Sequence, residues 1–472
     1  MALSLVNNVS SLTAQNNISK TSGMLSNSLE RLSSGLKINR GADGPAALVI
    51  SEQQRAQIAG LKTALDNTNK AVAMVQTGEG ALNEINRLLV KVRGLALDSA
   101  NNAVNDANAL AANQAEITNA LQSIDRIANS TQFGTRQLLD GSSGMKGIAS
   151  DEDVTVLKTD STAVAGTYAV NVTTAAEKAT ITAGTAQTDP LAADETLTLN
   201  NVSIKLTAGM TQAQVISTIN GYSNQTGVIA DNGGTGGATR LISRQFGTAA
   251  RISVQSNVAG AANSSGFGTT RIEDQGVDIA GTIGGVTATG LGNTLTGTGS
   301  AKGITISLAA SGAINTVTGA QGNVTVLDNS LVFQLGANFG QSAKVALDKS
   351  DTSALGLGVS TATGYANLAA IDVRNGAQAA QDALKIIDQA IADISTQRGR
   401  LGAFQANTLQ SNANNLQTTL QNTTAAESVV RDTDYAEEIA NFTKYQVMMQ
   451  AGQTVLGNAN QMTQLVAALL RG

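Results

Sequence analysis

Few residues of this 472-residue chain could carry out chemistry, and most of them are acidic. Two aspartates and a glutamate at 151–153 could together ligate a hard cation such as Ca²⁺. The glycine clusters GTGG (234–237) and GTIGG (281–285) could form loops that cradle a phosphate, but neither is followed by Lys-Ser or Lys-Thr. We therefore interpret the acidic cluster as a solvated loop and the glycines as turns.

The absent residue types exclude most catalytic sites. The chain has no histidine and no cysteine, so Ser-His-Asp and Cys-His nucleophiles, HExxH zinc sites and disulfides are all excluded. Its net charge is −5, which gives no basic surface for nucleic acid. We expect a structural or interaction protein that is not an enzyme and needs no cofactor or metal.

Two stretches near the chain ends carry apolar residues at the three- and four-residue spacing of a coiled coil. The segment RGADGP (40–45) interrupts the first stretch, and its proline suits the first position of a following helix. The stripe residues are Leu5, Val9, Leu12, Ile18, Leu25, Leu29, Leu32 and Leu36, then Met448, Ala451, Val455, Met462, Val466 and Leu469. Further helices are predicted over about 46–97, 107–130 and 375–425, with a polar break at 431–438.

The middle of the chain has a different character. It holds most of the 48 glycines, many threonines and short β-type runs such as VTVL, TYAVNV and TLTLNNVSIKL. One clear helix is predicted there, at 211–221, with Thr211 as its N-cap. The predicted fold class is therefore α+β: a long antiparallel helical coiled-coil core built from both chain ends, with a β-rich inserted outer region.

Neither a secretory signal nor a membrane span is expected. The first twenty residues lack a basic segment and a continuous apolar run. No run approaches the roughly 18 apolar residues of a spanning helix.

Both chain ends resemble bacterial flagellins. The motifs that carry this resemblance are RLSSGLKIN (31–39) with the Asp-bearing turn after it, QTGEGALNEINRLLVKVRGLALDSAN (76–101) and AAESVVRDTDYAEEIANFTKYQVMMQAGQTVLGNANQ (425–461). The resemblance covers 1–142 and 365–472. The chain departs from the family pattern at Gly44 and Pro45, where flagellins commonly have an acidic residue and an alanine.

The resemblance implies three domains. Residues 1–40 and 440–472 would form a terminal coiled-coil filament core, and 41–145 with 362–439 a helical bundle. Residues 146–361 would form a β-rich, surface-exposed insertion of one or two subdomains. This insertion includes a segment, at about 193–256, similar to the insertion module of flagellins and hook-associated proteins.

The resemblance also implies a function. The chain would be a structural subunit that polymerises into the extracellular flagellar filament, the propeller for swimming, after export in an unfolded state through the flagellar type III secretion channel. Implied partners are copies of the chain itself, a secretion chaperone, and the cap and hook-junction proteins. The closest alternative is a hook–filament junction protein. An adhesin acting through residues 151–360 is an alternative of another class.

Two sets of contacts follow from the resemblance. The stripe residues named above would form the polymer interface. Leu89, Lys91, Leu95 and Glu116 would contact a neighbouring subunit or the host toll-like flagellin receptor. Lys91 stands where a receptor-binding arginine is common and Gly94 where an acidic residue is common. Because lysine cannot form arginine's bidentate contacts, we expect weakened but not abolished recognition.

Overall fold

A computed structural model describes residues 8–101 and 104–469 of the chain, and these fall into two compact units. The first unit takes in Met1–Asn69, Gln334–Gln341 and Ser411–Gly472, and the second takes in Lys70–Phe333 and Ser342–Gln410. No helix within the described ranges has the length and hydropathy needed to cross a membrane.

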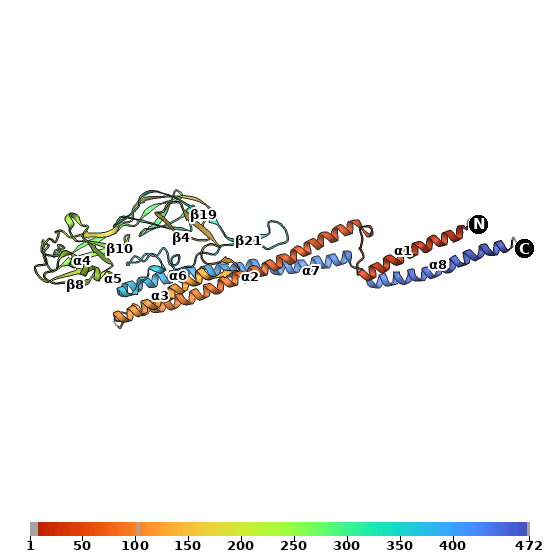
Figure 1. The fold of residues 1–472 in the computed structure, drawn as a ribbon, viewed down its shortest axis with the longest axis horizontal. Coiled ribbons are helices and arrows are strands. Elements are labelled where there is room, and N and C mark those ends of the chain that lie inside the picture. Colours follow the sequence, from red (N-terminus) through yellow and green to blue (C-terminus); the bar gives the residue numbers. More distant parts are fainter. Residues whose placement is uncertain (1–7, 102–103, 470–472) are drawn as a thin grey trace. The chain divides into compact units, whose positions relative to one another are not determined.

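The first unit is built from long helices. Helices α1 (Val9–Ser34) and α8 (Tyr435–Leu469) lie side by side in opposite directions (Figure 1). The unit also contains α7 (Ser411–Arg431) and the first half of α2 (Pro45–Ser99), whose 55 residues correspond to a length of about 80 Å at ~1.5 Å per residue. These helices confirm the predicted helical chain ends.

Local sequence explains where α1 begins and ends. The side chain of Asn8 accepts a hydrogen bond from the backbone N–H of Ser11 at 3.0 Å and so caps the first turn. At the other end, Gly35 adopts a left-handed conformation with φ of 74° and donates its N–H to the carbonyl of Arg31. Pro45 is the first residue of α2, as its fixed φ predicts.

Helices α3 (Ala107–Ser130) and α6 (Ala377–Ala403) pack in the second unit with the other half of α2. Their shared core contains Leu82, Ile85, Ile117, Ile124 and Ile386, all fully buried. A π-helical segment, Phe404–Gln410, follows α6 directly. Two short strands, β1 (Gln132–Phe133) and β2 (Arg136–Gln137), form a hairpin after α3.

An eight-stranded antiparallel sheet forms one part of the β-rich region, in the order β3-β19-β5-β13-β14-β15-β16-β4. Its edge strands approach each other: a β-carbon on Gly147 of β3 would lie 2.8 Å from a methyl of Val156 on β4. The strand bounds are β3 Met145–Ala149, β4 Val154–Thr159, β5 Gly166–Thr174, β13 Ala280–Ile283, β14 Val286–Leu291, β15 Thr294–Thr296, β16 Ile304–Leu308 and β19 Gly319–Asp328.

Two smaller sheets share a second hydrophobic core with helix α4 (Gln212–Gly221), which the short helix α5 (Ser223–Thr226) follows. The four-stranded sheet, in the order β12-β11-β7-β8, comprises Ile272–Gln275, Arg251–Ser256, Glu195–Leu199 and Val202–Leu206. The three-stranded sheet, in the order β6-β10-β9, comprises Lys178–Thr182, Arg240–Phe246 and Val228–Asp231. Positive φ angles at Asn200 and Asn201 form the two-residue turn between β7 and β8, a role that asparagine tolerates well.

Three short pairs complete the strands. The first is the hairpin of β1 and β2 described above. The second pairs β17 (Ala310–Ser311) with β18 (Asn315–Thr316), and the third pairs β20 (Leu331–Gln334) with β21 (Ser342–Val345). The predicted β-rich region thus contains two hydrophobic cores. They are separated in sequence because residues 178–275 are inserted between the strands of the eight-stranded sheet.

Candidate assembly interface

Helices α1 and α8 meet along a regular seam. Their less exposed residues alternate in steps of three and four, as in an antiparallel coiled coil. Residue pairs near both ends fix the register: Asn8 Nδ2 donates to the carbonyl of Ala459 at 3.1 Å, and Ser28 Oγ donates to that of Glu438 at 3.5 Å. The seam residues are Ser11, Ala14, Ile18, Thr21, Leu25, Ser28 and Leu32 on α1, and Glu438, Phe442, Tyr445, Met449, Gly452, Leu456 and Ala459 on α8.

Outside the seam, both helices carry further apolar side chains that are largely exposed in the described chain. Val9 is 65% exposed, Leu12 60%, Val455 56% and Met462 59%. Leu29 and Met448 are also exposed, and so are several residues outside the predicted stripes: Met24, Tyr435, Ile439 and Val447. The pair therefore has a seam of mostly apolar residues inside, with hydroxyl side chains on α1 and Glu438 on α8, and further apolar surface outside.

The predicted stripe residues divide between these two surfaces. Ile18, Leu25 and Leu32 lie half-buried in the seam, and Leu36 lies half-buried in the turn after α1, whereas Ala451 is exposed with the outer set described above. Leu5 lies outside the described residues, and the side chains of Val466 and Leu469 are not described either.

Sequence reasoning missed the inner face of α8. Its seam residues Met449, Gly452 and Leu456 are each one position after the predicted Met448, Ala451 and Val455. Apolar residues occupy both the predicted positions and the positions one residue later, so periodicity alone does not select the face of α8 that packs against α1. The signal was present in the regular spacing of Tyr445, Met449, Gly452, Leu456 and Ala459.

The two breaks in the helical pattern are joined by hydrogen bonds. Lys37 donates its N–H to the carbonyl of Arg431 at 2.6 Å, and Thr433 donates to that of Gly35 at 3.0 Å. Leu36 and Asp432 form an isolated antiparallel bridge between these bonds. The segments that end α1 and begin α8 are therefore held together where both depart from helical geometry.

Asp43 organises the turn before α2. Its Oδ2 accepts backbone hydrogen bonds from Arg40 at 2.8 Å and Asn39 at 3.0 Å. The N–H of Arg40 has the larger effect and that of Asn39 the next: both lower the pKa of the exposed Asp43 carboxyl because they stabilise its charged form. Arg40 in turn forms a two-pronged pair with Glu30, at 3.0 and 2.8 Å. Asp43 thus stabilises the turn in which it lies.

The predicted receptor-contact residues are only partly at the surface. Leu89 is fully buried in the helical core, so the expectation that it contacts a partner is wrong for the folded chain. Lys91 and Glu116 are exposed, and they form an ion pair of 2.6 Å between Nζ and Oε1. Leu95 is half-buried beside them.

The residues first considered for chemistry lie in turns. Asp151 accepts the N–H of Asp153 at 3.0 Å in the turn between β3 and β4. Gly284 and Gly285 form the turn between β13 and β14 with φ angles of 63° and 78°. Among the described residues, no group of three or more acidic side chains is placed to hold a metal ion.

Known proteins resemble the whole chain. The family model for the bacterial flagellin N-terminal helical region matches residues 6–144, and that for the C-terminal helical region matches residues 384–470. The flagellin of Salmonella typhimurium (strain LT2) is 32% identical over 100% of both chains, and so is the B-type flagellin of Pseudomonas aeruginosa (strain PAO1). Among solved structures, FliC from Burkholderia pseudomallei is 16% identical over 72% of this chain and 99% of its own, with a TM-score of 0.25.

Proposed function

The chain belongs to the bacterial flagellin family, and we propose that its copies join through the apolar side chains that α1 and α8 leave exposed. It is a structural subunit of the flagellar filament and not an enzyme. The relatives that match over the full chain are flagellins, so the alternative function, a hook–filament junction protein, is not favoured.

The observation that carries the proposal is the two-sided apolar character of the helical pair. The inner seam needs no second chain because α1 and α8 cover each other there. The outer residues, including Val9, Leu12 and Val455, remain in water in a single copy. Full burial of one such aliphatic side chain stabilises by roughly 1.5–3 kcal/mol, so several per subunit favour association.

Assembly into a filament needs contacts that repeat without closing into a ring. Head-to-tail contacts between unlike surfaces give an open helical polymer when their rotation does not close. The outer faces of α1 and α8 differ in sequence, so they can supply two unlike surfaces. We therefore assign Val9, Leu12, Leu29, Met448, Val455 and Met462 to contacts between subunits and the half-buried stripe residues to the seam within a subunit.

We retain three functional layers as part of this proposal: 1–40 with 440–472, 41–145 with 362–439, and 146–361. The joined breaks at Gly35–Lys37 and Arg431–Thr433 support the first boundary. Strands β3 to β21 run from Met145 to Val345, and these bounds lie close to those of the third layer, 146–361.

The remaining partners are proposed from the family. They are a secretion chaperone, the cap and the hook-junction proteins, with export through the flagellar type III channel to the cell exterior. A toll-like flagellin receptor would contact the exposed Lys91 and Glu116 and the half-buried Leu95, which lie on α2 and α3 in the second unit.

Seeded polymerisation tests the interface. Val455→Asn and Met448→Asn remove apolar surface from the outer face of α8, and Gln453→Asn is a matched exposed control. We expect the first two variants to slow filament growth at least tenfold, measured by sedimentation and electron microscopy, and the control to grow normally. Normal growth of both apolar-to-polar variants would assign the contacts elsewhere.

A further inference from the structure

A polar hollow of about 350 Å³ lies in the second unit. Asn200 and three segments line it. The segments are Asn224–Gly227 in and after α5, the β10–β11 region from Ser243 to Arg251, and the approach to α6 from Ala362 to Gln378. Small-molecule sites are commonly about 300–1,000 Å³, so the hollow can hold one small ligand.

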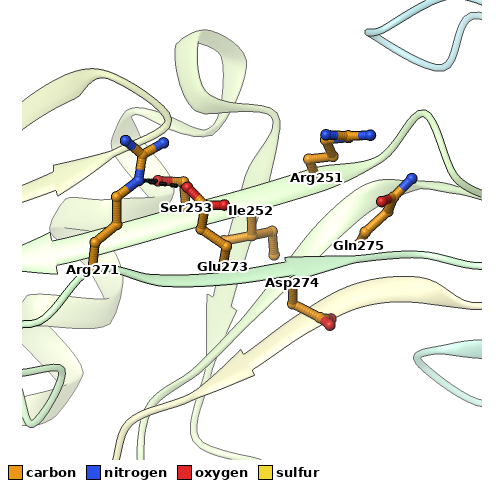
Figure 2. A pocket seen from close by; sticks show the side chains of 7 residues that line it. All are labelled: Arg251, Ile252, Ser253, Arg271, Glu273, Asp274 and Gln275. Carbon is orange, nitrogen blue, oxygen red and sulfur yellow. Dashed lines mark hydrogen bonds and ion pairs between the residues drawn. The ribbon is translucent and has the colours of Figure 1, made fainter.

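Two arginines supply positive charge at this hollow. Arg244 donates to the side chain of Asn224 at 3.0 Å, and Arg251 forms no side-chain hydrogen bond or ion pair within the described chain. Arg251 also borders a second hollow, of about 440 Å³, on strands β11 and β12. There Figure 2 shows a dashed contact from Arg271 but none from Arg251. Arg271 binds Glu273 at 2.6 Å and Ser253 at 2.8 Å.

The acidic group in the wall, Asp372, forms no ion pair with Arg251, although the charge of Arg244 acts on it. Asp372 already accepts two hydrogen bonds from Arg374, at 2.9 and 2.7 Å. Since Arg374 satisfies that carboxylate, the exposed Arg251 has no ion-pair partner within the described chain and is available to a ligand. The wall as a whole therefore favours a ligand that carries one negative charge.

The same wall also offers groups suited to hydroxyls. The side-chain amides of Gln225 and Gln245 form no hydrogen bonds within the described chain. The Oδ1 of Asn375 is buried without a partner. An amide both donates and accepts, and Oδ1 only accepts, so together they match hydroxyl groups, which do both.

We propose that this hollow binds a sugar acid, a monosaccharide unit with one carboxylate such as a hexuronate. The guanidinium of Arg251, with Arg244 beside the same hollow, pairs with the carboxylate, a geometry that arginine makes in two-pronged form. The amides of Gln225 and Gln245 and the buried Asn375 Oδ1 bind the ring hydroxyls. A purely apolar ligand would leave these polar groups desolvated without partners.

Calorimetric titration of the full-length, depolymerised chain with sodium glucuronate tests the proposal. Glucose lacks the carboxylate and acetate lacks the hydroxyls, so neither should bind measurably at concentrations where glucuronate does. A glucuronate-terminated disaccharide in a further titration distinguishes the free acid from the end of a glycan. Binding of either one supports the site.

Matched variants locate the binding. Arg251→Gln should weaken glucuronate binding at least tenfold, whereas Arg271→Gln, whose arginine is already paired with Glu273, should not change it. Gln245→Met removes an amide without altering charge and should also weaken binding, which gives a second test if Arg251→Gln does not fold. Absence of glucuronate binding, equal binding of acetate, or equal effects of the two arginine variants would overturn the proposal.

Discussion

Gly452 of α8 faces Ile18 of α1 so closely that a β-carbon on the glycine would lie 2.9 Å from Ile18 Cγ1. A glycine inside a helix destabilises it by about 1 kcal/mol relative to alanine. Isoleucine is branched at its β-carbon and strongly prefers one χ1 rotamer in a helix, so it cannot move aside easily. The close approach of the two helices therefore explains why a poor helix former occupies this position.

We expect Gly452→Ala to weaken the pairing of α1 with α8 although it raises helix propensity. The control is Gly457→Ala on the same helix, where an added β-carbon would have no neighbour within 4 Å. Filaments of the first variant should dissociate at a lower urea concentration than wild type, whereas those of the control should not. Greater resistance of Gly452→Ala would show that propensity outweighs the contact.

Asp43 gives the turn before α2 a dependence on pH. Backbone N–H groups hold its pKa below the ordinary value of 3.8, so the two hydrogen bonds persist above that value. They are lost as the pH falls through the lowered pKa, because a protonated carboxyl accepts them poorly. Asp43→Asn removes the charge at every pH and should weaken the turn under neutral conditions only.

Amide hydrogen exchange at Asn39 and Arg40 measures this effect. Protection, corrected for intrinsic exchange, should be lower in Asp43→Asn than in wild type near neutral pH. The two proteins should converge at a pH below the lowered pKa. The amide of Leu12, which donates to Asn8 in α1, serves as the unaffected reference. A difference that persists in acid would refute a charge-dependent role.

The pair of Lys91 and Glu116 allows a test of receptor recognition. Both side chains are about half exposed, so their ion pair adds little stability, typically below ~1 kcal/mol. Lys91→Arg should leave the unfolding curve unchanged but raise the response of a receptor-reporter cell line. Lys70→Arg, an exposed site on the same helix, should leave the response unchanged. Equal responses of wild type and Lys91→Arg would count against the contact.

Regular local patterns made the helices predictable. The expected helix at 107–130 coincides with α3, because its apolar face and its N-cap Asp106 lie next to each other in the sequence. Thr211 likewise precedes α4 as predicted, with a capping box to Gln214. These features depend on neighbours within a few residues.

Features that depend on distant residues could not be predicted in this way. The pairing of β5 with both β13 and β19 joins strands more than 100 residues apart, and no local signal encodes that order. The sugar-acid hollow likewise combines residues from 224 to 378 whose types are common on any surface. Only the fold brings Arg251 near Asn375.

The π-helical segment Phe404–Gln410 provides the last prediction. Leu401 and Leu409 are both buried, but they are eight residues apart. Two turns of a regular α-helix would place two residues on the same face at a spacing of about seven. A π segment accommodates one extra residue in a helix and so keeps both leucines on the buried face. We infer that the segment exists because the sequence carries that extra residue.

Deletion of the exposed Ala406 should therefore restore a seven-residue spacing and convert the segment to a regular α-helix with little loss of stability. Deletion of the exposed Thr418 from the regular helix α7 should rotate the following residues by about 100° and destabilise the chain strongly. Thermal unfolding followed by circular dichroism compares the two variants. A larger loss for the Ala406 deletion would mean that the π segment is needed for itself and not only to correct the spacing of the core residues.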